Sequence, residues 1–171
     1  ESPEYGNVDP STLLEQLIST GAYYIYERSW RVNNELMQYT VDCSASGRHQ
    51  LYVFQAADFG TPWDRFQRYA ANAHHMIALG RNYDDPNAQA IAMTLKAVFV
   101  SLVADLYGDI PYREAYRIED DITQPAIDPQ SEVYPALIGM LLTANDLYRT
   151  ATDSNGNYTY PLTVPGKDLL Y

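Results

Sequence analysis

The chain has 171 residues, of which 46% are hydrophobic and 19% are charged, a balance typical of a folded globular domain and not of a disordered segment. Its 22 acidic side chains against 11 basic ones give a net charge of −11, which argues against binding to nucleic acid or to anionic lipid through a basic face. The single cysteine, Cys43, excludes a disulfide within the chain and any multi-cysteine metal site.

The first expected helix begins at Pro10, with Asp9 as its N-cap, and its apolar pattern continues after a break near Ser29 as far as Thr40. Residues 42–61 follow as a long irregular segment, with a short extended piece suggested by the alternation at 51–55. A connection of this length between helices is more often functional than a short turn is, so we expect it to carry a site.

A second helix is expected to begin at Thr61-Pro62 and to stop at Gly80. A third begins at Asp85-Pro86, and its apolar stripe is Ile91, Leu95, Val98, Phe99, Leu102, Val103 and Leu106. The longest apolar run, residues 97–106, is shorter than a bilayer span, and the sequence opens without the apolar core of a signal peptide. We therefore expect the chain as given to be soluble.

The third helix ends in the stretch LVADLYGDIPYREAY, residues 102–116. Gly108 follows the last stripe residue, where a left-handed backbone is expected, and Pro111 keeps Ile110 extended. Ile110 then folds back onto the helix, and Tyr112 and Tyr116 cover the helix end. These residues predict a buried corner.

A fourth helix begins near Ser131, with Pro135 in its first turn. One face of it is expected to carry Tyr134, Leu137, Ile138, Leu141, Leu142, Asn145 and Tyr148. Residues 152–171 read as a loop, with a turn signal at Asn155-Gly156. The sequence therefore predicts an all-α fold of four or five antiparallel helices with long irregular loops and no convincing signal for a sheet.

Two motifs carry a resemblance to a known family. Residues 106–112, LYGDIPY, are followed after a polar, proline-containing connection by Asp128, Gln130, Val133 and Tyr134, which open the next helix. In this order the two motifs resemble the SusD/RagB family of bacterial outer-membrane lipoproteins, over residues 60–150. Trp63 and Phe66, early in an amphipathic helix, are also similar to that family's pattern.

The resemblance implies helix pairs in a tetratricopeptide-like stack, and a protein that captures glycans, or peptides in some members, without being an enzyme. It also implies a partner, a SusC-like TonB-dependent transporter, and a lipid anchor on the external face of the outer membrane. Members of the family are longer and carry a lipidated cysteine near the N-terminus, which Cys43 does not replace. Residues 1–171 are therefore expected to be the N-terminal helical part of a longer SusD-like chain.

The binding residues are chosen from their chemistry alone, because the matched motifs do not include any ligand contacts. A sugar site needs flat aromatic faces for pyranose rings and polar groups for hydroxyls. The long segment and the end of the first helix supply both, and the candidates are Arg48, His49, Tyr52, Phe54, Asp58, Trp30 and Asn34. The expected ligand is an oligosaccharide.

Other functions remain open as alternatives. A scaffold that binds peptides or only protein would use the 16 tyrosines at an interface. A glycan hydrolase would need paired carboxylates, for which Asp84 with Asp85, or residues 119–121, are candidates. Asp109 is a separate candidate for a catalytic acid, but local spacing gives it no carboxylate or histidine partner. The adjacent His74 and His75 point about 100° apart on a helix, so we expect no metal site and no cofactor.

Overall fold

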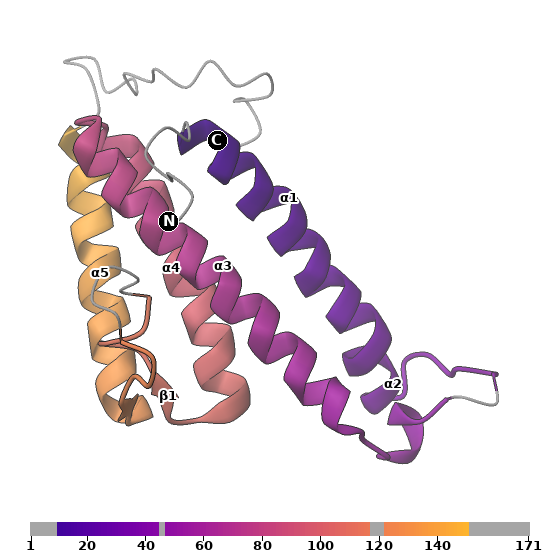
Figure 1. Cartoon of the computed structure of the whole chain (residues 1–171). Helices are drawn as coiled ribbons and strands as arrows, with labels where there is room; N and C mark the ends of the chain where they lie inside the picture. Colours follow the sequence, from indigo (N-terminus) through magenta and orange to yellow (C-terminus); the bar gives the residue numbers. More distant parts are fainter. Residues whose placement is uncertain (1–9, 45–46, 117–121, 151–171) are drawn as a thin grey trace.

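The structure is a computed structural model that describes residues 10–44, 47–116 and 122–150. Four long helices dominate these residues: α1 (Pro10–Arg28), α3 (Ala56–Asn82), α4 (Pro86–Tyr107) and α5 (Gln130–Thr150). Each packs antiparallel against the next, so that α3 and α4 lie between α1 and α5 (Figure 1). The predicted all-α fold is confirmed.

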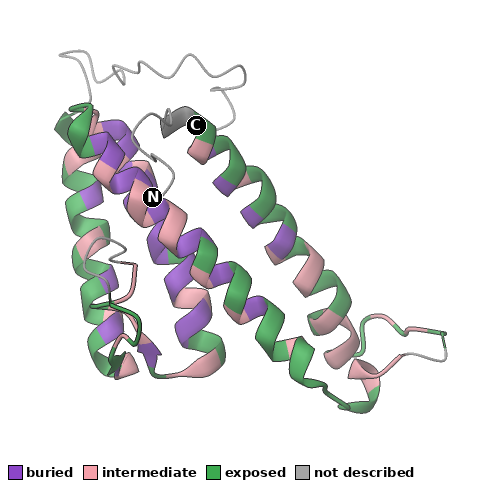
Figure 2. Cartoon of the chain, in the orientation of Figure 1, coloured by how far each residue is buried: buried purple, intermediate pink, exposed green. Residues whose placement is uncertain are grey.

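Small side chains let the two central helices approach each other closely. Ala70 and Ala73 of α3 and Ala88 and Ala92 of α4 are completely buried. In Figure 2 buried residues gather where α3 and α4 run side by side, whereas the first turns of α3, near α2, are mostly exposed. The core therefore lies at the α3–α4 interface, and the start of α3 extends away from it.

The helix beginnings confirm one expectation and correct another. Asp85 caps α4 by accepting a hydrogen bond from the Ala88 backbone N–H at 3.0 Å, as predicted. However, α3 begins at Ala56 and not at Thr61, because the Gln55 backbone N–H donates to the Asp58 carboxylate at 2.6 Å. Pro62 therefore lies inside the helix, where the hydrogen bond that its nitrogen cannot donate is lost.

Gly80 does not end α3, which continues to Asn82. A Cβ atom at position 80 would lie 2.8 Å from the Gln89 side chain and 2.9 Å from its backbone nitrogen. The glycine is therefore explained by the close approach of α4, a tertiary contact that a pattern along one helix does not reveal.

The connection from α1 to α3 contains short helical turns and no strand among its described residues. A π-helical turn, η2 (Ser29–Asn33), replaces the break expected near Ser29, and α2 (Asn34–Leu36) follows it. A 3₁₀ turn, η3 (His49–Leu51), precedes α3. The prediction of an extended piece at 51–55 was wrong. Tyr52 adopts a left-handed backbone conformation, with φ 57° and ψ 29°, which an extended strand does not contain.

The glycine–proline corner joins the two motifs. Short strands β1 (Ile110–Pro111) and β2 (Ile127–Asp128) pair antiparallel, and Ile110 is completely buried, as expected. Asp109 caps α5 by accepting from the Gln130 backbone N–H at 2.9 Å, and the Gln130 side chain donates to the last turn of α4, at Ala104 O, at 2.9 Å. The buried corner is therefore confirmed.

Two details of the corner differ from expectation. Gly108 has a positive φ of 80°, but its ψ of −116° lies outside the left-handed helical region, so the chain turns directly into β1. The rings of Tyr112 and Tyr116 lie over Lys96, in the middle of α4, and not over the helix end. Their packing thus covers a buried lysine.

The buried faces of α4 and α5 are rotated relative to the predicted stripes. On α4, Val98 and Leu106 are exposed, although Phe99 and Val103 are buried as expected. On α5 the buried residues are Val133, Leu137 and Ala144, whereas Ile138, Leu141 and Leu142 are exposed. The expected loop at 152–171 lies outside the described residues.

By length and composition, α4 alone among the described helices is suited to cross a membrane, with a mean hydropathy of 1.7 over its most apolar window. It is longer than the run at 97–106 because it begins at Pro86. Half of that window is buried inside the fold, as in the core helix of a folded domain.

Candidate functional site

The π-helical turn at the end of α1 carries an exposed tryptophan. A π turn adds a residue to the helical register, and such turns occur frequently at functional sites. Trp30, within this turn, is 56% exposed. Its indole face is therefore available to a ligand.

A hollow of about 450 Å³ lies beside Trp30. Its walls come from η2, α2, the segment after α2, and η3 with the residue before it. They combine an indole with guanidinium, imidazole and carboxylate groups: Trp30, Arg31, Glu35, Thr40, Val41, Asp42, Arg48 and His49. The volume is within the range of small-molecule sites, roughly 300–1,000 Å³.

One carboxylate on α3 organises the charged wall of the hollow. Asp58 faces Arg48 through two contacts, 3.2 Å from Nη1 and 3.4 Å from Nη2. The hydrogen bond from the Gln55 backbone N–H, supported by His49 and Arg48, holds the pKa of Asp58 below its ordinary value. Asp58 therefore remains ionised and keeps the Arg48 guanidinium at the edge of the hollow.

The His49 imidazole lies between two carboxylates. Its Nδ1 is 3.4 Å from Glu35 Oε2, and its Nε2 is 3.3 Å from Asp58 Oδ1. Both distances are long for hydrogen bonds, and Glu35 Oε2 and His49 Nε2 are buried without a hydrogen bond of normal geometry among the described residues. This wall of the hollow therefore holds two buried polar atoms, Glu35 Oε2 and His49 Nε2, that could form hydrogen bonds after a small movement of their side chains.

Aromatic rings surround the charged groups. Phe54 lies 6.0 Å from the His49 ring and 5.5 Å from Phe59, measured between ring centroids. The Tyr52 hydroxyl donates to the Leu36 carbonyl at 3.2 Å, which ties the segment before α3 to α2. The Tyr52 and Phe54 rings remain exposed.

The structure brings most of the candidate residues together. Trp30, Arg48 and His49 line the hollow itself. Asp58, Phe54 and Tyr52 stand behind this wall, through the contacts described above. Asn34 is not part of the lining; its backbone carbonyl accepts the Tyr39 N–H at 2.9 Å and closes the turn after α2.

The sequence analysis missed five residues that also line the hollow: Arg31, Glu35, Thr40, Val41 and Asp42. Thr40, Val41 and Asp42 lie at the junction of the expected helix and loop, where composition is uninformative. Asp42 is held in place by Gln50, whose side chain donates to the Asp42 carbonyl and accepts from its N–H, both at 3.0 Å. This reciprocal pair folds the segment back onto η3.

The carboxylates considered for hydrolysis have other partners where the structure describes them. Asp85 caps α4 and Asp109 caps α5, whereas Asp84 is exposed. Residues 119–121 lie outside the described residues. Within the described ranges, no group of three or more His, Cys, Asp or Glu side chains is placed to hold a metal ion.

Comparison with known proteins identifies the family. The model of the family SusD-like_2, described as "Starch-binding associating with outer membrane", matches residues 3–171. The chain therefore belongs to this family, whose description links it to starch binding and to the outer membrane. No curated protein matches the chain.

Proposed function

We propose that this protein captures oligosaccharides at the external face of the outer membrane and delivers them to a SusC-like TonB-dependent transporter. In this proposal residues 1–171 are the helical part of a longer, lipid-anchored chain. Capture involves no bond cleavage. The family match supports glycan binding and association with the outer membrane.

The Trp30 hollow is the observation that carries the proposal. A pyranose ring presents apolar C–H groups on its faces and hydroxyls around its edge, so it needs an aromatic face and polar groups together. Trp30 supplies the face, and the Arg48–Asp58 pair with Glu35 and His49 supplies donors and acceptors. Ligand hydroxyls would pair with the two buried atoms that lack hydrogen bonds, one with Glu35 Oε2, on the Nδ1 side of the imidazole, and another with His49 Nε2, on the Asp58 side.

The structure also favours binding over hydrolysis. A glycosidase needs one carboxyl group with a raised pKa beside a second, ionised one. At the hollow, Asp58 has a lowered pKa and pairs with Arg48. This carboxyl is suited to position a guanidinium, not to donate a proton to a leaving group.

A panel of oligosaccharides tests the proposal by isothermal titration and by chromatography of the sugars after incubation. We expect at least one oligosaccharide to bind and to be recovered uncut. Trp30→Ala should reduce the affinity by about 5- to 150-fold, since loss of aromatic stacking costs about 1–3 kcal/mol by analogy with base stacking. Tyr83→Ala is the matched control, because Tyr83 is 55% exposed but lies at the other end of α3.

Arg48→Ala and Tyr52→Ala should also weaken capture while leaving the fold intact. Arg48→Ala removes the ion pair with Asp58 as well, so thermal unfolding of each variant must be measured beside its affinity. Unchanged affinity in the Trp30, Arg48 and Tyr52 variants would remove this hollow from the site. Cleaved sugars would establish a hydrolase instead, and binding of protein or peptide alone would favour the scaffold.

A further inference from the structure

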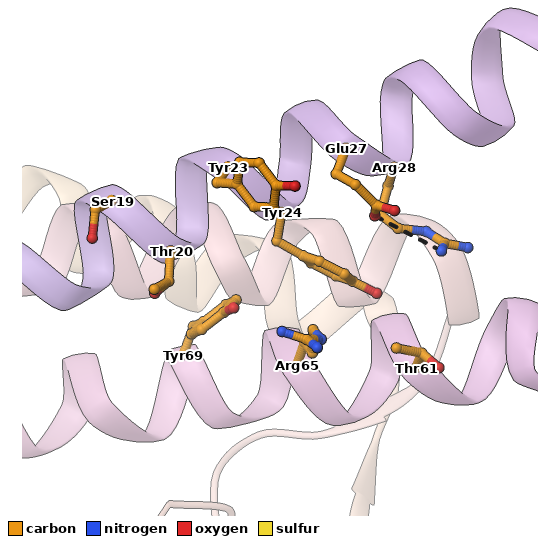
Figure 3. Close-up of a pocket in the computed structure, with 9 residues that line it drawn as sticks. All are labelled: Ser19, Thr20, Tyr23, Tyr24, Glu27, Arg28, Thr61, Arg65 and Tyr69. Atoms are coloured by element: carbon orange, nitrogen blue, oxygen red, sulfur yellow. Dashed lines mark ion pairs between the residues drawn. The ribbon is translucent and has the colours of Figure 1, made fainter.

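A second hollow, of about 570 Å³, lies between α1 and α3, nearer the middle of both helices (Figure 3). Its lining includes hydroxyl groups, three tyrosine rings and two guanidinium groups: Ser19, Thr20, Tyr23, Tyr24, Glu27, Arg28, Thr61, Arg65 and Tyr69. None of these residues belongs to the Trp30 hollow.

Tyr24 forms the floor of this second hollow and carries a buried polar group without a partner. Its side chain lies between the two helices, in edge-to-face contact with Phe66 at 5.4 Å and with Tyr69 at 6.5 Å between centroids (Figure 3). The residue is 5% exposed, and its hydroxyl has no hydrogen bond among the described residues. Since a buried hydroxyl is normally paired, this one is suited to a ligand group.

Two arginines from different helices converge on the same ring. The Arg65 guanidinium carbon, from α3, is 4.9 Å from the Tyr24 ring centroid, and that of Arg28, from α1, is 6.0 Å away. Arg65 has no ion pair with a carboxylate within the part of the chain that the structure describes. The hollow therefore presents a cation that the described residues leave without a counter-ion.

The one carboxylate in the lining is already engaged. Glu27 Oε1 lies 2.9 Å from Arg31 Nε, and Glu27 Oε2 is 4.0 Å from Arg28 Nη1. The lining thus contains two guanidinium groups, those of Arg28 and Arg65, and one carboxylate that Glu27 shares with Arg31 outside the lining. The hollow is therefore locally positive, in a chain whose net charge is −11. Such a local reversal of sign favours an anionic ligand group at this place.

We propose that this second hollow is a subsite for a carboxylate-bearing sugar, a uronic acid residue of the captured oligosaccharide. Arg28 and Arg65 bind the carboxylate, since guanidinium groups match its planar, two-oxygen geometry. Tyr23, 68% exposed on the rim, stacks on the pyranose ring. The Tyr24 and Thr61 hydroxyls pair with the sugar hydroxyls, and the Thr20 hydroxyl, which already donates to the Gln16 carbonyl, accepts from one of them.

This inference rests on the proposed function, because it assigns a ligand class to the same capture activity. Tyr23 and Trp30 are seven residues apart along α1 and η2, a separation of about 10 Å at helical rise. An oligosaccharide of a few rings is long enough to reach both hollows. The uronic acid unit of the oligosaccharide would then set specificity, while Trp30 stacks on a sugar ring whatever its identity.

The test compares an oligogalacturonate with the same oligosaccharide after reduction of its carboxyl groups to alcohols. Isothermal titration with the full 171-residue chain should show the oligogalacturonate binding on the order of tenfold or more tightly, as expected for charge-assisted hydrogen bonds. Added salt should reduce this preference. Neither measurement requires a variant, so neither depends on the folding of one.

Variants then locate the preference. Arg65→Gln and Arg28→Gln should each remove most of the preference for the acidic sugar, and Arg65→Lys should restore part of it. Arg68→Gln is the matched control, because Arg68 is an exposed arginine on α3 that is not part of the lining. The Arg68→Gln variant should prefer the acidic oligosaccharide as strongly as the unchanged chain does.

Equal affinity for the two oligosaccharides, or a full preference in both arginine variants, would overturn the subsite while leaving glycan capture standing. Equally tight binding of an acidic peptide of the same charge would also overturn it, by showing a general anion site. Failure of both oligosaccharides and of the neutral panel to bind would reject the subsite and the proposed function together.

Discussion

Asp128 offers the strongest test of how the two family motifs hold each other. It is 3% exposed and accepts the backbone N–H groups of Tyr112 at 3.0 Å and Arg113 at 2.7 Å, together with Arg113 Nε at 2.5 Å. Asp128→Ala leaves two backbone donors without their acceptor, at about 1–3 kcal/mol each. With water relieving part of this cost, we expect the free energy of unfolding to fall by about 2–4 kcal/mol in urea titrations followed by circular dichroism.

Glu132→Gln provides the matched control, because Glu132 also pairs with Arg113, at 2.7 Å, but its side chain is 54% exposed. An exposed pair contributes little to stability, so this variant should unfold close to the unchanged chain. Equal effects of the two substitutions, or an Asp128→Ala change below about 1 kcal/mol, would refute a structural role for the buried carboxylate.

The pKa of Asp128 determines how the stability difference between the unchanged chain and Asp128→Ala depends on pH. Burial raises this pKa, but the Arg113 backbone and side-chain donors and the Tyr112 N–H outweigh burial and hold it below its ordinary value. A lowered pKa stabilises the fold above the unfolded pKa, about 3.9, and this stabilisation is lost as pH falls through the folded pKa. The difference between the unchanged chain and Asp128→Ala should therefore shrink in acid.

Three glycine substitutions should separate backbone conformation from packing in thermal or urea unfolding. Gly108→Ala should cost about 1–3 kcal/mol through its positive φ of 80° alone, since a Cβ there meets no atom within 4 Å. Gly21→Ala should cost about 1–3 kcal/mol through packing, because its Cβ would lie 2.6 Å from the buried Phe99 ring. Gly139→Ala, in open space on exposed α5, should instead stabilise by about 0.5–1 kcal/mol; a loss there would contradict this reasoning.

Local signals in the sequence predicted the parts of the fold that depend on neighbouring residues. Asp85 followed by Pro86 correctly marks the start of α4, because a cap is satisfied within one turn. The start of α3 was wrong because Thr61-Pro62 resembles a cap more closely than Gln55, whose N–H is paired by Asp58 three residues later. Gly80 misled for another reason, since its role depends on Gln89 of the next helix.

The candidate site divides in a similar way. Composition drew attention to Arg48, His49 and Trp30, and the structure brings these three to one hollow. The second hollow had no comparable signal, because Arg28 and Arg65 lie on different helices and meet only through the register of α1 against α3. A helical pattern gives the face of each helix but not which residues stand opposite each other.

The most direct test of glycan capture uses the two tryptophans of the chain. Trp30 is exposed in its hollow, whereas Trp63 packs edge-to-face on Tyr107 at 5.0 Å between centroids and serves as an internal control. In ¹H–¹⁵N spectra recorded while an oligosaccharide that binds in titration is added, the Trp30 indole N–H should shift saturably and that of Trp63 should stay in place. Saturable binding with an unmoved Trp30 signal would contradict the account.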